Sequence, residues 1–284
     1  MKKLIAAAAF LFIIAVCFGA CSSNSVAQHS ELNSEMLSSA AETPDAAQTA
    51  QLEESSQTSP SNSPLKVGIR NDSPGFAYLN IDTGEISGFE VDIIKSVGAL
   101  LERDIEFVVV NDTTREDALK SGEIDLIAAT FTITDGRKED YLFTRPYYTD
   151  RLAFLVPKES EAQTVADLDG VKVGVADDTT AVEDLESAAG SKGIFVEAVP
   201  YGTFTDAKKA LFSGEIDALY MDESILRSYQ YGRVIEEYFT PQPYGVAALK
   251  ENAELLNAVD SAIDALTKDG TLEAFADHWE LKLN

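Results

Sequence analysis

The five residues SGEID occur at Ser121–Asp125 and again, unaltered, at Ser213–Asp217. Each copy follows a segment with helical character, and each leads into a short apolar run, Ile124–Ala128 in the first copy and Ile216–Tyr220 in the second. The glycine can take the left-handed conformation that ends a helix, and the apolar run is typical of a buried strand. The repeat therefore predicts equivalent helix–turn–strand corners in two similar lobes, and we give SGEID a structural role without ligand contacts.

Strand-like and helix-like segments alternate around both copies, which indicates an α/β fold. The segments at 65–69 and 171–175 alternate like strands, and Asp112 and Thr113 can cap a helix that runs to Lys120. Further helices are expected at 251–268 and 271–280. One segment, 150–157, leaves the first lobe and another, 241–246, returns to it. Two crossings predict a cleft between the lobes, and ligands of open α/β sheets gather at the carboxyl ends of the strands.

The formal net charge of −26 is the most unusual feature of the composition. So acidic a surface repels nucleic acid and anionic lipid headgroups, and it favours a soluble monomer. An anionic small ligand would need a locally basic site.

The first 21 residues differ from the rest. A basic pair, Lys2-Lys3, precedes an apolar stretch from Leu4 to Phe18, and the segment Phe18-Gly19-Ala20-Cys21 resembles a bacterial lipobox. Cys21 would then carry a lipid anchor, although an ordinary secretory signal with an incidental cysteine is the alternative. Residues 22–64 have no Phe, Tyr or Trp and no Lys or Arg, and they are predicted to form a disordered tether.

Two arginines are placed to face the predicted cleft. Arg115 lies in the first turn of a predicted helix, where the helix dipole disfavours a cation, so an anion could hold it there. The alternative is an exposed arginine paired with Glu116 or Asp117. Arg70 follows the strand at 65–69 at its carboxyl end, and its alternative partner is Asp72.

The polar residues after the two SGEID strands complete the set. Hydroxyl groups at Thr130 and Thr132, with Arg137 five residues beyond Thr132, suit the capture of a carboxylate. Asp222 ends the second SGEID strand and could bind an ammonium group or cap the helix from Ser224 onward. Phe76 could form either the cleft wall or part of the core.

Residues 65–284 resemble the bacterial extracytoplasmic solute-binding proteins for polar amino acids, solute-binding protein family 3. The segments that carry the resemblance are GFEVDIIKSVGALL at 88–101, SGEIDLIAATFTITDGRKEDYLFTRPYY at 121–148 and SGEIDALYMDESIL at 213–226. The segments NDTTREDALKSG at 111–122 and PQPYGVA at 241–247 are similar to the aspartate/glutamate-binding branch.

The resemblance implies a type II-like periplasmic-binding-protein fold, in which each lobe is a mixed sheet flanked by helices and two crossing strands join the lobes. Lobe 1 would comprise residues 65–153 plus 244–284, and lobe 2 residues 154–243. The ligand-binding set carried over by the resemblance and the cleft argument is Arg70, Phe76, Arg115, Thr130, Thr132, Arg137, Thr179, Thr180, Asp222 and Tyr244.

Individual roles also follow from the resemblance. Arg137, Thr132 and the backbone at Thr130 would bind an α-carboxylate, and Asp222 the α-ammonium. Arg115, with Arg70 beside it, would bind a side-chain carboxylate. Thr179 and Thr180, at a helix start, would add N–H donors to the α-carboxylate. The chain departs from the family pattern at Ser73, where an aromatic residue is common, and at Asp177 and Asp178, where glycine is common.

The sequence thus predicts a lipid-anchored extracytoplasmic receptor that binds L-glutamate or L-aspartate, closes on it and delivers it to an ABC importer. It predicts no enzyme activity, cofactor, metal or nucleic-acid partner. A glutamine- or cystine-binding protein is the main alternative, and an enzyme similar to cyclohexadienyl dehydratase is a further one.

Overall fold

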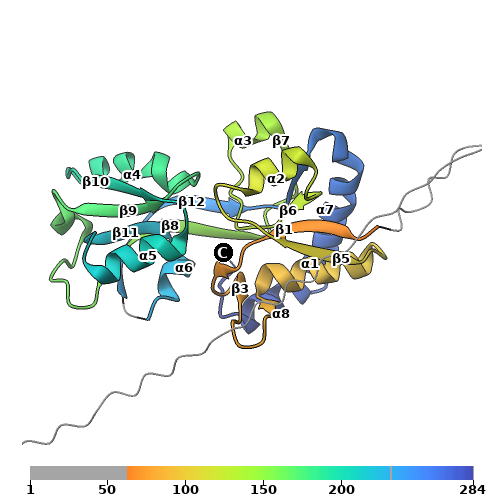
Figure 1. Ribbon diagram of the computed structural model, residues 1–284, viewed down its shortest axis with the longest axis horizontal. Coiled ribbons are helices and arrows are strands. Elements are labelled where there is room, and N and C mark those ends of the chain that lie inside the picture. The colour runs from red at the N-terminus through yellow and green to blue at the C-terminus, as the bar shows by residue number, and fades with distance from the viewer. Residues whose placement is uncertain (1–62, 231, 284) are drawn as a thin grey trace, which may run out of the picture. The chain divides into compact units, whose positions relative to one another are not determined.

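The computed structural model describes residues 63–230 and 232–283, and all of them lie in one compact unit, Gln57–Asn284. The predicted signal peptide, Cys21 and all of the predicted tether except residues 63 and 64 lie outside the described residues. Two five-stranded sheets with flanking helices make up the fold (Figure 1). We call the first sheet with its helices lobe 1 and the second sheet with its helices lobe 2.

The sheet of lobe 1 has the strand order β5-β1-β6-β13-β7. Strand β1 is parallel to both of its neighbours, β5 and β6, whereas β13 is antiparallel to both of its neighbours, β6 and β7. The strands are β1 (Leu65–Ile69), β5 (Ile105–Val109), β6 (Leu126–Ile127), β7 (Tyr141–Phe143) and β13 (Ala247–Leu249). A smaller sheet consists of β2 (Asp72–Ser73), β3 (Ala77–Leu79) and β4 (Ile86–Ser87).

Helices cover both faces of this sheet. On one face β1 shares a hydrophobic cluster with α1 (Phe89–Leu100), α7 (Ala253–Lys268) and α8 (Thr271–His278). On the other face α2 (Arg115–Ser121) packs through Ala118 and Leu119 on Ile127. The short helices α3 (Asp135–Asp140) and η2 (Lys250–Asn252) complete the lobe. Helix α7 begins later than the sequence predicts, because residues 250–252 form a separate 3₁₀ turn, and α8 ends at His278, before the predicted residue 280.

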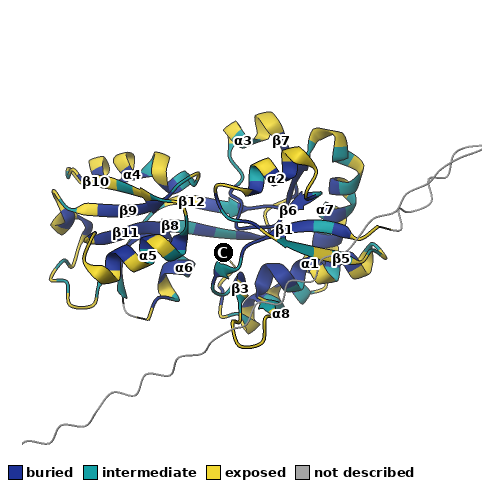
Figure 2. Cartoon of the chain, in the orientation of Figure 1, coloured by how far each residue is buried: buried dark blue, intermediate teal, exposed yellow. Residues whose placement is uncertain are grey.

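The sheet of lobe 2 has the order β10-β9-β11-β8-β12 and repeats the three-strand core of the first, since β9 is parallel to both β10 and β11. Its elements are β8 (Tyr148–Pro157), η1 (Val165–Leu168), β9 (Lys172–Ala176), α4 (Thr180–Ser191), β10 (Glu197–Tyr201), α5 (Phe204–Ser213), β11 (Ala218–Asp222), α6 (Glu223–Arg227) and β12 (Gly232–Tyr244). In Figure 2 the inner strands β9, β11 and β8 of this sheet are mostly buried, whereas the edge strands β10 and β12 carry exposed residues.

The two SGEID copies form the same corner. Gly122 and Gly214 end α2 and α5 in the left-handed conformation, with φ of 77° and 76°. After each turn the aspartate ties the corner to the neighbouring strand, because Lys66 N donates to Asp125 Oδ2 at 2.9 Å and Lys172 N donates to Asp217 Oδ2 at 2.9 Å. The structural role predicted for the repeat is thus confirmed.

Each corner also packs on a glycine of the preceding strand. A Cβ atom at Gly68 would lie 2.5 Å from Ile124 Cδ1, and one at Gly174 would lie 2.4 Å from Ile216 Cδ1. At these distances a Cβ atom would force the isoleucine side chain of SGEID to shift, so the glycine of the strand allows this close packing.

The strands that join the lobes are β8 and β12. They pair antiparallel from Pro157 and Gly232 to Tyr148 and Tyr244, and a bridge between Thr132 and Tyr244 connects the end of β12 to lobe 1. The predicted lobe boundaries fall inside β8 and at the end of β12, and they remain a prediction.

The start of α2 differs from the prediction. Thr114 holds the N-cap position without a side-chain cap, and the side chain of Asn111 instead accepts hydrogen bonds from the N–H groups of Thr113 and Thr114. The prediction that Asp112 and Thr113 cap this helix is therefore wrong. The carboxylate of Asp112 turns toward two arginines, because burial gives a charge–charge contact more weight than an exposed helix cap.

Candidate functional site

Two carboxyl-end loops of lobe 1 bring the arginines together. Arg70 follows β1, Asp112 follows β5, and Arg115 is the first residue of α2. All three side chains are almost completely buried. Asp112 Oδ1 lies 3.0 Å from Arg115 Nη1, and the same oxygen accepts a hydrogen bond from Arg70 Nη1. The parallel strands thus carry two cations and one carboxylate to one edge of the sheet.

Arg70 is held by two carboxylates. Its Nε donates to Asp72 Oδ1 at 2.9 Å, in addition to its contact with Asp112. Burial alone would lower the pKa of Arg70, but Asp112 and Asp72 outweigh burial and raise it. Asp72, the predicted alternative partner of Arg70, does bind it. Arg70 is connected to the site by Asp112, which also contacts Arg115.

Arg115 and Arg137 converge on a single oxygen of lobe 2. Arg115 Nη2 donates to the main-chain carbonyl of Asp178 at 3.1 Å, and Arg137 Nη2 donates to the same carbonyl at 3.2 Å. Asp178 adopts a φ of 55°, which is uncommon for a residue with a side chain. Both guanidinium groups also lie against the ring of Phe131, at 4.7 and 4.1 Å from its centroid.

The second amino group of each guanidinium is fixed by lobe 1 itself. Arg115 Nη1 donates to the carbonyl of Ala129, and Arg137 Nη1 donates to the carbonyl of Thr132, each at 3.0 Å. Burial and the charge of Arg70 lower the pKa of Arg115, and burial and the charge of Arg115 lower the pKa of Arg137 to about 10. Arg70, Arg115 and Arg137 thus lie close enough to affect one another in a chain with a formal net charge of −26.

Thr130 stands behind this pair with an unusual backbone, at a φ of 46°. Its N–H donates to Glu90 Oε1 at 2.7 Å, and the hydroxyl of Tyr147 donates to the same oxygen. The backbone donor expected from Thr130 is thus engaged by the protein. Burial raises the pKa of Glu90.

The predicted hydroxyl groups meet at the joining strand β12. Thr132 Oγ1 of lobe 1 and Thr180 Oγ1 of lobe 2 both donate to Gln242 Oε1, at 2.9 and 2.5 Å. Thr179 holds the N-cap position of α4 and Thr180 is the first helical residue, as expected for a helix start. Thr179 Oγ1 donates to the carbonyl of Ala176 and leaves the helix without a side-chain cap.

Asp222 lies at the end of β11 with 9% of its surface exposed. Its side chain does not cap α6, and Oδ1 has no hydrogen-bond partner. Burial, followed by the nearby carboxylate of Asp150, raises the pKa of Asp222 to about 7. A cationic partner would stabilise the ionised form of this carboxylate.

The aromatic residues of the predicted set form a buried wall. Tyr244 stacks on Tyr148 with ring centroids 6.0 Å apart, and Phe76 packs edge-on against both rings. Phe76 is fully buried and also contacts Phe89. The sequence left open whether Phe76 belongs to the cleft wall or to the core, and its burial places it in the core.

Buried polar atoms without hydrogen bonds gather around these residues. Within residues 63–230 and 232–283 they include Glu90 Oε2, Asp112 Oδ2, Arg115 Nε and Asp222 Oδ1. Such atoms are rare in folded proteins, and each calls for a partner. The set contains donors and acceptors of both charges, which suits a small zwitterionic molecule.

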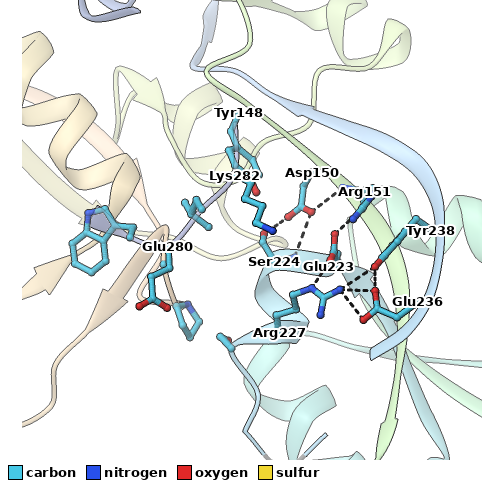
Figure 3. A pocket seen from close by; sticks show the side chains of 15 residues that line it. Tyr148, Asp150, Arg151, Glu223, Ser224, Arg227, Glu236, Tyr238, Glu280 and Lys282 are labelled. Carbon is cyan, nitrogen blue, oxygen red and sulfur yellow. Dashed lines mark hydrogen bonds and ion pairs between the residues drawn. The ribbon is translucent and has the colours of Figure 1, made fainter. Parts of the chain in front are cut away.

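Two pockets lie near the site. One, of about 470 Å³, is lined by Arg137, Thr179, Thr180 and Asp178 and so contains three of the predicted ligand residues. The other, of about 600 Å³, contains none of them. Figure 3 shows that its charged groups already pair with one another, as in the contacts of Arg227 with Glu223 and Glu236. We therefore place the candidate site on the side of Arg137.

Sequence reasoning missed several residues of this site. Asp112 could have been found, because it follows a strand whose neighbour carries Arg70 at the same edge of the sheet. No comparable sequence pattern predicts a role for Glu90, Gln242 or the carbonyl of Asp178. Within the described part of the chain, no group of three His, Cys, Asp or Glu residues is suited to a metal ion. None of the helices described there is long and apolar enough to cross a bilayer.

Comparison with known proteins places the chain in a family. Residues 65–282 match the family described as "Bacterial extracellular solute-binding proteins, family 3". The chain belongs to this family, and it is therefore a solute-binding protein and not an enzyme.

Individual relatives are about 30% identical to the chain over the aligned residues. The "ABC transporter glutamine-binding protein GlnH" of Bacillus subtilis (strain 168) is 29% identical over 229 residues, which cover 77% of this chain and 81% of that protein. The "Glutamate-binding protein GluB" of Corynebacterium glutamicum is 32% identical over 232 residues, or 75% of this chain and 77% of that protein.

A solved structure, "An ancestral arginine-binding protein bound to glutamine", superposes with a TM-score of 0.70. It is 30% identical and covers 76% of this chain and 97% of the other. The expected type II periplasmic-binding-protein fold, with two mixed sheets flanked by helices, is confirmed by this likeness.

Proposed function

We propose that this protein binds an acidic L-amino acid, glutamate or aspartate, between its two lobes and delivers it to an ABC importer. The observation that carries the proposal is the convergence of Arg115 and Arg137 on one oxygen atom. Two guanidinium groups held this close repel one another, and an anion between them relieves that repulsion. Burial is the main cause of the lowered pKa of both arginines, and the charge of Arg115 adds to it at Arg137.

The assignment of groups follows the charges of the ligand. Arg137 and Thr132 bind the α-carboxylate, Asp222 binds the α-ammonium, and Arg115 binds the side-chain carboxylate. Thr179 and Thr180 supply N–H groups from the start of α4. We assign no direct ligand contact to Thr130, Phe76 and Tyr244, which support the residues that bind the ligand. Arg70 acts indirectly, because it binds Asp112, which also binds Arg115.

The energy of these contacts is sufficient. A charge-assisted hydrogen bond contributes about 1.5–3 kcal/mol, and a micromolar complex requires about 8 kcal/mol. The three charged groups of the ligand, paired with Arg137, Asp222 and Arg115, supply this after the cost of ordering the lobes. A ligand that contacts both lobes also stabilises the closed form over the open one.

The test is calorimetry with the twenty amino acids on the wild type and on Arg115→Met. We expect glutamate or aspartate to bind best, and the variant to lose at least ~50-fold for that ligand but less than ~5-fold for glutamine. Lys120→Met removes an exposed cation from the same helix and serves as the control. Equal losses for glutamate and glutamine would contradict the role given to Arg115.

Glutamine is the second candidate, since a glutamine-binding protein is among the relatives and a related solved structure is bound to glutamine. A neutral side chain would leave Arg115 with only Asp112 and main-chain oxygens as partners, and this cost makes us prefer the acidic ligands. A wild type that binds glutamine tighter than glutamate would favour this candidate.

We also propose that the mature chain is a monomer anchored to the cell membrane by a lipid on Cys21. The argument is the lipobox-like sequence before Cys21. Mass spectrometry of the membrane fraction tests it, because Cys21→Ser should release the protein from the membrane and remove the acyl mass.

A further inference from the structure

The internal repeat allows the two lobes to be compared position by position. Counting back from SGEID, Asp112 of lobe 1 corresponds to Phe204 of lobe 2, and Arg115 corresponds to Ala207. The shared Lys-Val-Gly of β1 and β9 in turn places Arg70 opposite Ala176. Lobe 1 thus carries charges at the three positions where lobe 2 carries apolar residues.

These apolar residues are buried as deeply as the charges that they match. Ala176 and Ala207 are fully buried, and Phe204 is 2% exposed. Phe204 is the first residue of α5, and its position is set by Thr203, whose hydroxyl accepts a hydrogen bond from Asp206 N at 3.1 Å. Lobe 2 therefore presents a fixed aromatic ring at the point where lobe 1 presents a carboxylate.

Phe204 meets Arg70 across the boundary between the lobes. The guanidinium carbon of Arg70 lies 4.0 Å from the centroid of the Phe204 ring, and Arg70 has no exposed surface. Asp72 and Asp112 hold the edge of the same guanidinium group. A planar cation bound at its edge by carboxylates and on its face by a ring is fully desolvated, which is the setting in which cation–π contacts are strongest.

We propose that Phe204 is a closure residue, whose ring covers Arg70 when the lobes close, and that Asp112 connects this contact to Arg115. This assignment rests on the proposed function, because the ligand that Arg115 binds is what the closed form retains. Arg70 then serves closure and positions Arg115, whereas Arg115 and Arg137 contact the ligand.

The positions of the lobes can be followed by energy transfer between two dyes. The full chain with Cys17→Ser and Cys21→Ser accepts dyes at Lys95→Cys on α1 and Lys209→Cys on α5, both exposed. Phe204→Leu keeps an apolar side chain and removes the aromatic ring. Arg70→Lys keeps the positive charge and removes the planar guanidinium group. Phe195→Leu is the control, because Phe195 lies on lobe 2 and is 74% exposed.

We expect Phe204→Leu and Arg70→Lys each to lower the closed fraction without ligand, and to raise the dissociation rate of the best-bound amino acid about tenfold. The preference for glutamate over glutamine should stay unchanged in Phe204→Leu. In the double variant the effects should be less than additive, since both remove one contact. A closed fraction and dissociation rate equal to those of the control, or strictly additive effects, would overturn the proposal.

The two proposals fail in different ways. A wild type that binds none of the twenty amino acids would overturn the proposed function, yet the closed fraction without ligand would still decide whether Phe204 and Arg70 form a closure contact. A wild type that binds glutamate while Phe204→Leu behaves like the control would overturn only the closure role.

Discussion

Asp112 holds Arg115 in place, with Oδ1 3.0 Å from Nη1, and the same oxygen also binds Arg70. One buried carboxylate thus orients two buried cations from neighbouring strand ends. Arg115 Nη1 also donates to the carbonyl of Ala129, and Nη2 donates to the carbonyl of Asp178. The arginine that we assign to the ligand side chain is therefore held at a fixed orientation before any ligand arrives.

Replacing Asp112 should destabilise the fold. In Asp112→Asn two buried cations lose their shared charge, and we expect the free energy of unfolding to fall by roughly 3 kcal/mol. Urea denaturation measures this loss. Asp117→Asn, an exposed change on the same helix, should leave the midpoint within experimental error. Equal midpoints for both variants would show that Asp112 does not hold the arginines.

Replacing Arg137 should weaken the binding of every amino acid. The α-carboxylate is common to all of them, so Arg137→Met is expected to lower the affinity for glutamate and glutamine alike by about 100-fold or more. Its neighbour Lys138 is exposed and pairs with Asp135, so Lys138→Met is the matched control. Selective loss of glutamate in Arg137→Met would instead place the side-chain carboxylate there.

Binding should depend on pH through Asp222. Burial and Asp150 raise the pKa of Asp222 to about 7, and an ammonium ligand requires its ionised form. Affinity is therefore expected to fall by about tenfold for each pH unit below 7 while Asp222 alone titrates. Calorimetry from pH 5 to 8 measures this, and proton release on binding near pH 6 gives an independent check. If the affinity does not change between pH 5 and 8, Asp222 does not have the role that we give it.

The same carboxylate should affect the stability of the ligand-free protein in the opposite sense. Because its folded pKa lies above the unfolded value, the folded state holds a proton that the unfolded state loses, so stability falls as pH rises from about 4 to 7. Asp222→Asn removes this penalty. We expect its melting temperature at pH 8 to rise by about 4 °C or more while amino-acid binding is lost. A lower melting temperature would show that Asp222 is satisfied within the protein.

The SGEID aspartates should matter for stability and not for ligand binding. Asp125→Ala and Asp217→Ala each leave a strand N–H, of Lys66 or Lys172, without its acceptor, at a cost of about 1–2 kcal/mol each. Thermal unfolding of both variants tests this, and Glu123→Ala, at an exposed residue of the first copy, is the control. An altered ligand preference in either variant would contradict a purely structural role.

Much of the architecture follows from local sequence. The repeated SGEID, its glycine and the strands at 65–69 and 171–175 predict both lobes, because helix ends and strand periodicity depend on residues close together in the chain. The same reasoning places Arg70 and Arg115 at one sheet edge, since the carboxyl ends of parallel strands share that edge.

The partners of these residues are decided only by the tertiary structure. From the sequence Arg115 could pair with Glu116 or Asp117, yet it contacts Asp112, and its second partner, the carbonyl of Asp178, belongs to the other lobe. Phe204 reaches Arg70 in the same way. Contacts of this kind join residues that are distant in sequence. A carboxylate, a carbonyl or a ring reaches a buried cation only if the lobes and their loops pack to within about an ångström of the right position. Local sequence does not determine this packing.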